Sequence, residues 1–113
     1  MELSCLQENL FQGLNIVSRI TSSRAELPIL KNIWLQAEKG FLKLSTTNLE
    51  IAITTKSRAK VTKTGAITIP AQLLTNYIGF LPNEVLDLKV INNELIIKSK
   101  NQKAKIKGIP ADE

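Results

Sequence analysis

The sequence contains no histidine and only one cysteine, Cys5, among its 113 residues. Without histidine there is no Ser-His-Asp triad, no histidine-based general acid–base catalysis and no histidine metal site. A single cysteine forms neither an internal disulfide nor a zinc or iron–sulfur site, and it is typical of a reducing compartment. We therefore expect a cytoplasmic protein in which Cys5 is a small core residue of the first strand.

Other signals of chemistry are also missing. The sequence has neither GxxxxGK[ST] nor GxGxxG, so no phosphate-binding loop is indicated, and its carboxylates stand singly except for Asp112 and Glu113. We expect no catalytic, cofactor-binding or metal-binding residues and no enzymatic activity. No apolar stretch approaches the roughly 20 residues of a membrane span. The N-terminus lacks a signal-peptide pattern, which predicts a soluble, intracellular chain without a membrane partner.

The positive charge is concentrated near the C-terminus. The net charge is +5, from 15 basic and 10 acidic residues. Five of the basic residues follow one another without an intervening acid: Lys98, Lys100, Lys103, Lys105 and Lys107. In the rest of the chain the numbers of basic and acidic residues are equal. An apolar fraction of 43% and this length favour a single domain over residues 1–113.

Two amphipathic helices are predicted, over residues 7–22 and 71–80. Ser4 is a candidate cap for the first helix, and Pro70 suits the entry to the second. The apolar side of the first helix contains Leu6, Leu10, Leu14, Val17 and Ile20, and the opposite side contains Glu8, Gln12, Asn15 and Arg19. The apolar side of the second contains Leu73, Leu74, Tyr77, Ile78 and Leu81, and its polar side contains Gln72, Thr75, Asn76 and Gly79.

Strands are predicted around the helices. Their ranges are about 2–5, 29–38, 41–47, 49–58, 66–69, 85–91, 94–99 and 103–108, with a basic and polar connection over 56–64 and a tight turn at Asn92-Asn93. Alternation in the fourth range places Leu49, Ile51 and Ile53 on one face. The order strand, helix, strand, strand, strand occurs twice, at about 2–58 and 66–108. This duplicated β-α-β-β-β unit, with two helices packed on antiparallel sheet, predicts an α+β fold.

An ordered set of short segments carries a family resemblance. The set comprises Leu27-Pro-Ile-Leu, Asn32, Leu35-Gln36, Gly40, Leu42, Leu44, Thr47-Asn-Leu-Glu50, Gly65-Ala66, Ile69-Pro-Ala71, Leu81-Pro82 and Ile109-Pro-Ala-Asp112. Together these segments resemble the first domain of the bacterial sliding clamp, the β subunit of DNA polymerase III. The resemblance covers residues 1–113.

The resemblance implies a DNA-clamp-like domain of a non-catalytic processivity factor for a replicative DNA polymerase. In that family two subunits of three similar domains close head to tail into a ring around duplex DNA, with helices lining the hole. A weakly attractive lining without sequence preference permits sliding. The polymerase and the clamp loader bind the family through later domains that this chain does not include.

The resemblance also indicates DNA-binding positions. Arg24 stands where the family places an arginine that touches DNA, and Arg19 lies on the outer side of the first helix by periodicity. Gln72 occupies a position where the family often has a basic residue, so the polar side of the second helix is uncharged here. Gln72 and Asn76 remain able to hydrogen-bond phosphates or water.

The lysine-rich strand over 103–108 has three interpretations. Lys103, Lys105 and Lys107 share one face, which is typical of an edge strand protected against aggregation. The resemblance implies a subunit boundary, with apolar contacts from Ala104 and Ile106 and ion pairs from Lys103 and Lys105. A nucleic-acid patch is the third. The alternative to the clamp is a stand-alone basic α+β module that binds a protein or RNA partner through this strand.

Overall fold

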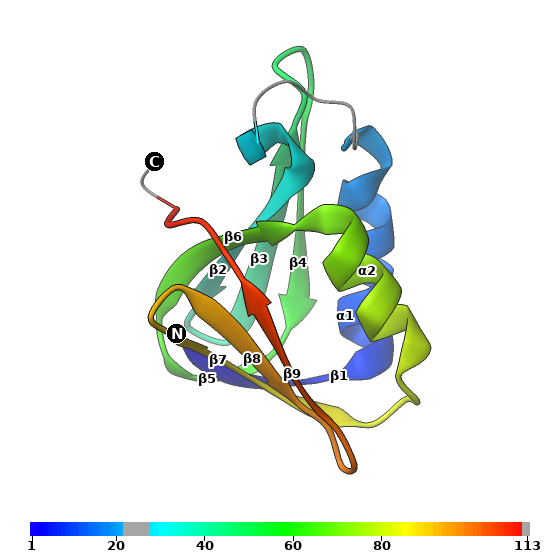
Figure 1. Cartoon of the computed structure of the whole chain (residues 1–113), viewed down its shortest axis with the longest axis vertical. Coiled ribbons are helices and arrows are strands. Elements are labelled where there is room, and N and C mark those ends of the chain that lie inside the picture. The colour runs from blue at the N-terminus through cyan, green and yellow to red at the C-terminus, as the bar shows by residue number, and fades with distance from the viewer. Residues whose placement is uncertain (22–27, 112–113) are drawn as a thin grey trace.

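The computed structural model describes residues 1–21 and 28–111, over which two α-helices, two short 3-10 helices and nine strands follow one another. The first half contains β1 (Glu2–Leu6), α1 (Gln7–Val17), η1 (Ser18–Ile20), η2 (Pro28–Lys31), β2 (Asn32–Glu38), β3 (Phe41–Thr47) and β4 (Ala52–Arg58). After the short strand β5 (Lys60–Lys63), the second half contains β6 (Gly65–Pro70), α2 (Ala71–Phe80), β7 (Val85–Ile91), β8 (Glu94–Lys98) and β9 (Lys103–Lys107). The repeated β-α-β-β-β order is present (Figure 1).

The strands form two antiparallel sheets that interlock the halves. One sheet has the order β5-β1-β7-β8-β9 and the other β4-β3-β2-β6. The first strand of each half therefore pairs with strands of the other half: β1 with β7, and β6 with β2. Because neither half completes a sheet from its own strands, we expect the two halves to fold together.

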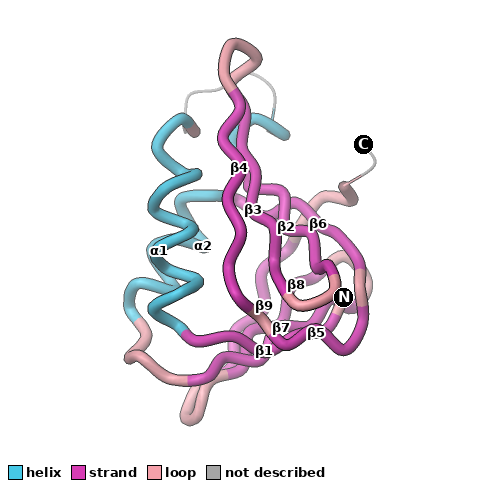
Figure 2. The backbone as a smooth tube through the Cα atoms, turned by 180° about the vertical axis from the view of Figure 1, so that it is seen from behind, coloured by secondary structure: helices cyan, strands magenta, loops and turns pink. Residues whose placement is uncertain are grey.

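The two helices lie antiparallel along one side of the strands, as Figure 2 shows from behind. Gln7 at the start of α1 donates from Nε2 to the carbonyl oxygen of Ile78, 2.7 Å away, near the end of α2. At the other end, Gln72 donates from Nε2 to Oγ1 of Thr21 at 3.4 Å. None of the helices in the described part of the chain is long and apolar enough to cross a membrane.

A single apolar core joins the helices to the inner faces of both sheets. Its fully buried large side chains are Leu10, Leu14, Ile33, Leu35, Leu42, Leu44, Ile67, Ile69, Leu74, Ile78, Leu86 and Leu88. At Gly13 the backbone of α1 approaches the four-stranded sheet, because a Cβ there would lie 2.6 Å from Cδ1 of Leu44. Ser57 on β4 donates from Oγ to the carbonyl oxygen of Asn9 at 3.0 Å, which holds α1 on the sheet.

Several element boundaries differ from those predicted. The first helix stops at Val17 and tightens into η1, where Oγ1 of Thr21 donates to the carbonyl oxygen of Ser18 at 2.8 Å. The strand predicted from residue 29 begins at Asn32, because Pro28–Lys31 form a 3-10 turn. Proline fixes φ near the helical value, which suits the first position of such a turn.

The turn between β3 and β4 also corrects the prediction. Oδ1 of Asn48 accepts hydrogen bonds from the backbone N–H groups of Glu50 and Ile51 at 3.0 and 2.9 Å. This side-chain turn holds Leu49 at a φ of 77° and delays the strand to Ala52. Leu49 and Ile51 are therefore 73% and 52% exposed, and they do not join the buried face.

The connection predicted over 56–64 is largely strand. β4 continues to Arg58, and Lys60–Lys63 form β5, which pairs with β1 at the edge of the five-stranded sheet. The hairpin at Asn92-Asn93 is confirmed, with φ values of 52° and 62° at the two asparagines. Positive φ at both central residues is characteristic of the tight turns that join two strands.

The cap of α1 comes from a distant segment and not from Ser4. Ser4 lies in β1 and donates from Oγ to Oδ1 of Asp87 at 2.6 Å. The N–H groups of Gln7 and Glu8 donate instead to the carbonyl oxygen of Glu84 at 2.9 Å and to Oδ1 of Asn83 at 3.2 Å. Orphan N–H groups at a helix start donate to any suitably placed oxygen, and here the α2–β7 loop supplies both acceptors.

The polar and apolar sides of α2 are rotated relative to the prediction. Leu73, predicted on the apolar side, is 56% exposed, and Thr75, predicted on the polar side, is buried. Oγ1 of Thr75 has no hydrogen-bond partner among the described residues. Gly79 allows the approach of α1, since a Cβ there would lie 2.6 Å from Cε1 of Phe11. Contact between the helices thus decides which side of α2 is covered.

Cys5 is buried in β1, as predicted. Burial, with a smaller contribution from the Asp87 carboxylate, raises the pKa of its thiol from 9.0 to about 12.

We expect a disulfide reagent such as DTNB at a pH of about 8 to label the folded protein slowly and the urea-unfolded protein rapidly, because the thiolate is the reactive form. Above pH 9.0 the unfolded thiol loses its proton while the folded thiol keeps it, so stability declines as the pH rises toward 12. Equal labelling rates in the two states would contradict this expectation.

Candidate nucleic-acid interface and open sheet edges

The outward sides of α1, η1 and α2 form a continuous, nearly uncharged surface, which we call the helical face. Its exposed residues are Glu8, Gln12, Asn15, Ile16, Arg19, Gln72, Leu73, Asn76, Gly79 and Phe80. Glu8 and Arg19 are the charged residues among them, and they carry opposite signs. The amide side chains both donate and accept hydrogen bonds, so this surface can contact phosphate and water without a large ionic attraction.

Three of the four predicted DNA-binding residues lie on the helical face. Arg19 is exposed in η1, at the C-terminal end of α1, and Gln72 and Asn76 are exposed one turn apart on α2. The hydrogen bond between Gln72 and Thr21 places Gln72 at the same end of α1 that carries Arg19. Arg24, the fourth, lies outside the described residues.

The lysine strand β9 is an open edge of the five-stranded sheet. Lys103, Lys105 and Lys107 are exposed and Ala104 is half-buried. Ile106 is 7% exposed and packs in the core of this chain, opposite Leu95. The apolar surface that β9 can offer a neighbour therefore comes mainly from Ala104, and Ile106 contributes little beyond its backbone.

The backbone N–H and C=O groups that are free at this edge belong to the lysines of β9. The N–H of Ser99 donates to the carbonyl of Gln102 at 2.8 Å, and the N–H of Gly108 donates to the carbonyl of Asn93 at 2.8 Å. Hydrogen-bonded pairs alternate along an antiparallel ladder, so Ala104 and Ile106 bond to β8. The N–H and C=O groups of Lys103, Lys105 and Lys107 point away from β8, to the side where a further strand could pair with β9.

A second open edge, β4, was missed by sequence reasoning. Lys56 and Arg58 are exposed on it, and Nζ of Lys56 lies 4.6 Å from the centre of the Phe41 ring. Together with Asn9 and Gln12 of α1 they line a cavity of about 270 Å³. The sequence signal for this strand was the alternation that turns Ile53, Thr55 and Ser57 toward the inner side of the sheet. The charged residues between and beside them obscured that alternation. Within residues 1–21 and 28–111 no cluster of acidic or cysteine side chains could hold a metal ion.

Comparison with known proteins identifies the fold. A family model described as DNA polymerase III beta subunit, N-terminal domain, matches residues 1–113. The chain belongs to this family. It is 37% identical over 117 residues to a beta sliding clamp of Synechococcus elongatus and 34% identical over 122 residues to one of Synechocystis, with the whole chain covered in both alignments.

Solved structures of the family agree with the architecture. The structure entitled Caulobacter crescentus pol III beta superposes with a TM-score of 0.96 at 29% identity, covering 100% of this chain and 31% of that one. A DnaN sliding clamp from Bartonella birtlesii gives 0.95 at 29% identity, covering 99% of this chain and 30% of that one. The predicted α+β clamp fold is confirmed. These matches favour the clamp hypothesis over the stand-alone module.

The family members are longer than this chain. The chain covers 31% of the Synechococcus and Synechocystis proteins, so it spans about a third of the length of the curated relatives it matches. Family membership therefore applies to the domain described above, which corresponds to about a third of each relative. The open edges β9 and β4 belong to two different sheets, and each is available to continue its sheet into a neighbouring domain.

Proposed function

We propose that this chain is the first domain of a sliding clamp, a processivity factor that encircles and slides on duplex DNA. The observation that carries the proposal is the combination, in a member of the β subunit family, of one weakly charged helical face with an open edge on each sheet. Edges that continue into neighbouring domains would build a ring, and the helical face would then line its hole.

The DNA-facing residues of this domain would be Arg19, Arg24, Gln72 and Asn76. Arg19 supports a phosphate contact through its exposure on η1, and the amides of Gln72 and Asn76 support direct or water-mediated hydrogen bonds. Because Glu8 offsets one of the two arginines in net charge, the domain alone would hold DNA weakly. A ring retains DNA by its closed shape, so weak contacts suffice and permit sliding.

The subunit boundary would lie at β9. An incoming strand would hydrogen-bond to the free backbone groups of Lys103 and Lys105, Ala104 would supply apolar contact, and the two ammonium groups would pair with carboxylates of the neighbouring subunit. Ile106 would support this strand from within the core.

We further propose that residues 1–113 are the first of three domains in a cytoplasmic, non-catalytic protein. The matched relatives extend to about three times this length. The additional domains would close the ring head to tail with a second subunit. They would also hold the sites for the replicative polymerase and the clamp loader.

Changing the charge of the helical face tests its contact with DNA. We expect Arg19→Ala in the 113-residue chain to reduce the slope of log affinity against log salt for duplex DNA by about one, since each lost phosphate contact removes about 0.9. Gln72→Lys should increase the slope by about the same amount. Fluorescence anisotropy with a labelled duplex measures both.

The matched control is Lys39→Ala in the β2–β3 turn, which removes the same charge from an exposed residue outside the helical face. If Lys39→Ala lowers the slope as much as Arg19→Ala, the attraction is a property of net charge and the helical face is not the DNA side.

A further inference from the structure

The outward side of the five-stranded sheet, opposite the core, carries an excess of lysine; we call it the outer sheet face. The strand register places three carboxylates on it, Glu2, Asp87 and Glu94. It also places seven lysines there: Lys60, Lys63, Lys89, Lys98, Lys103, Lys105 and Lys107. The concentration of positive charge in this domain is thus on the side of the sheet that faces away from the core, and not on the helical face.

Most of these lysines lack an acidic partner. The one ion pair in the described part of the chain joins Nζ of Lys89 to Oε1 of Glu2 at 3.8 Å, and Asp87 accepts a hydrogen bond from Ser4. Lys98 on β8 stands between Asp87, directly opposite it on β7, and Lys103, directly opposite it on β9. Like charges in directly opposed positions destabilise a sheet. Asp87 offsets one of the two ammonium groups in this row, and a bound carboxylate would offset the other.

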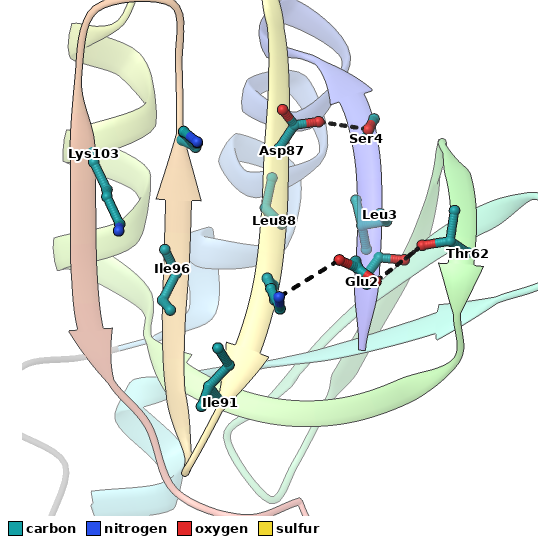
Figure 3. A pocket seen from close by; sticks show the side chains of 11 residues that line it. Glu2, Leu3, Ser4, Thr62, Asp87, Leu88, Ile91, Ile96 and Lys103 are labelled. Carbon is teal, nitrogen blue, oxygen red and sulfur yellow. Dashed lines mark hydrogen bonds and ion pairs between the residues drawn. The ribbon is translucent and has the colours of Figure 1, made fainter.

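A shallow cavity of about 480 Å³ lies on the outer sheet face between these charges. Ile91 and Ile96, diagonal neighbours on β7 and β8, form its apolar part, and Ile91 is 43% exposed. Lys98 and Lys103 line the same cavity, and Figure 3 shows Lys103 and Ile96 on adjacent strands there. Aliphatic surface beside unpaired ammonium groups suits a ligand that combines an aliphatic group with carboxylates.

We propose that the outer sheet face binds an acidic segment of a partner protein that places an aliphatic side chain against Ile91 and Ile96 and a carboxylate against Lys98. Charge complementarity selects an anionic partner. Among the described residues of its five strands, this face carries no aromatic side chain and no arginine, the residues that nucleic-acid platforms use to stack bases and grip phosphates.

A short extended peptide tests the proposal. Alternate residues of an extended chain share one face, so the probe is fluorescein-labelled Ser-Glu-Ser-Leu-Ser-Glu-Ser, with a matched peptide in which Gln replaces Glu. We expect the 113-residue chain to bind the acidic probe more tightly than the neutral one in an anisotropy titration. Lys98→Glu should weaken binding about tenfold, because one attraction is lost and one repulsion is gained. Ile96→Thr should also weaken it.

Two controls keep the result decisive. Lys39→Glu makes the same charge change in the β2–β3 turn and should leave the affinity unchanged. Lys98 and Ile96 are on β8, which is paired on both sides, so these variants leave the open edge β9 and the proposed ring intact. Unchanged affinity in Lys98→Glu, equal loss in Lys39→Glu, or tighter binding of a single-stranded DNA oligonucleotide than of the acidic peptide would each overturn the proposal.

Discussion

Replacing Gly13 by leucine is expected to destabilise the domain by about 3 kcal/mol, a large share of the stability of a domain of this size. Glycine inside a helix ordinarily costs about 1 kcal/mol relative to alanine, so a larger residue would be favoured at an exposed site. At Gly13 a Cβ would lie 2.6 Å from Cδ1 of Leu44 and 3.0 Å from Oγ of Ser57. Leu44 is fully buried and cannot move aside without disturbing the core.

Urea unfolding followed by the fluorescence of Trp34, the single tryptophan, measures this effect as a lower midpoint at an unchanged m-value. Gln12→Leu is the matched control, because Gln12 is the exposed neighbour on α1 and a surface substitution changes stability by less than about 0.5 kcal/mol. Equal midpoints for the two variants would show that α1 does not approach β3 as closely as described.

Replacing Lys105 by proline is expected to weaken subunit association at least about tenfold while leaving the stability of the domain nearly unchanged. The N–H of Lys105 points to the open side of β9, so proline removes a donor that only a neighbouring strand would use. The experiment uses a chimera in which residues 1–113 replace the matching segment of the Synechococcus elongatus beta sliding clamp, and sedimentation velocity measures its association.

Ala104→Pro is the informative counterpart. The N–H of Ala104 bonds to β8, so this variant should lower the unfolding midpoint of the isolated 113-residue chain, which Lys105→Pro leaves in place. If Lys105→Pro associates as tightly as the unsubstituted chimera, β9 is not the boundary strand. If both variants unfold alike, the assignment of inward and outward backbone groups is wrong.

The elements were largely predictable because their signals are local. The spacing of Leu10, Leu14 and Val17 predicted α1, and the two asparagines of the β7–β8 turn predicted its positive φ values. The pairing of β1 with β7 and of β6 with β2 was not predictable, since alternation within a strand shows which face is buried but not which strand lies beside it. Boundaries failed where a side chain competed with the backbone, as Asn48 does before β4.

The candidate site was predictable in part. Periodicity correctly placed Arg19, Gln72 and Asn76 on exposed helical positions and β9 at a lysine-rich stretch. It could not show that Ile106 packs into the core of its own domain, because burial of a strand residue depends on what covers the sheet. The helical contact through Phe11 and Gly79, which exposes Leu73, likewise depends on packing between segments far apart in sequence.

The proposal that this chain forms part of a closed ring around DNA is tested by its retention on circular DNA. The Synechococcus chimera is assembled by a clamp loader on a nicked circular plasmid and separated from free protein by gel filtration. We expect that the chimera stays on the circle, that cutting the plasmid once releases it, and that the 113-residue chain alone is retained on neither DNA. Equal retention on circular and linear DNA would show that no closed ring surrounds the DNA.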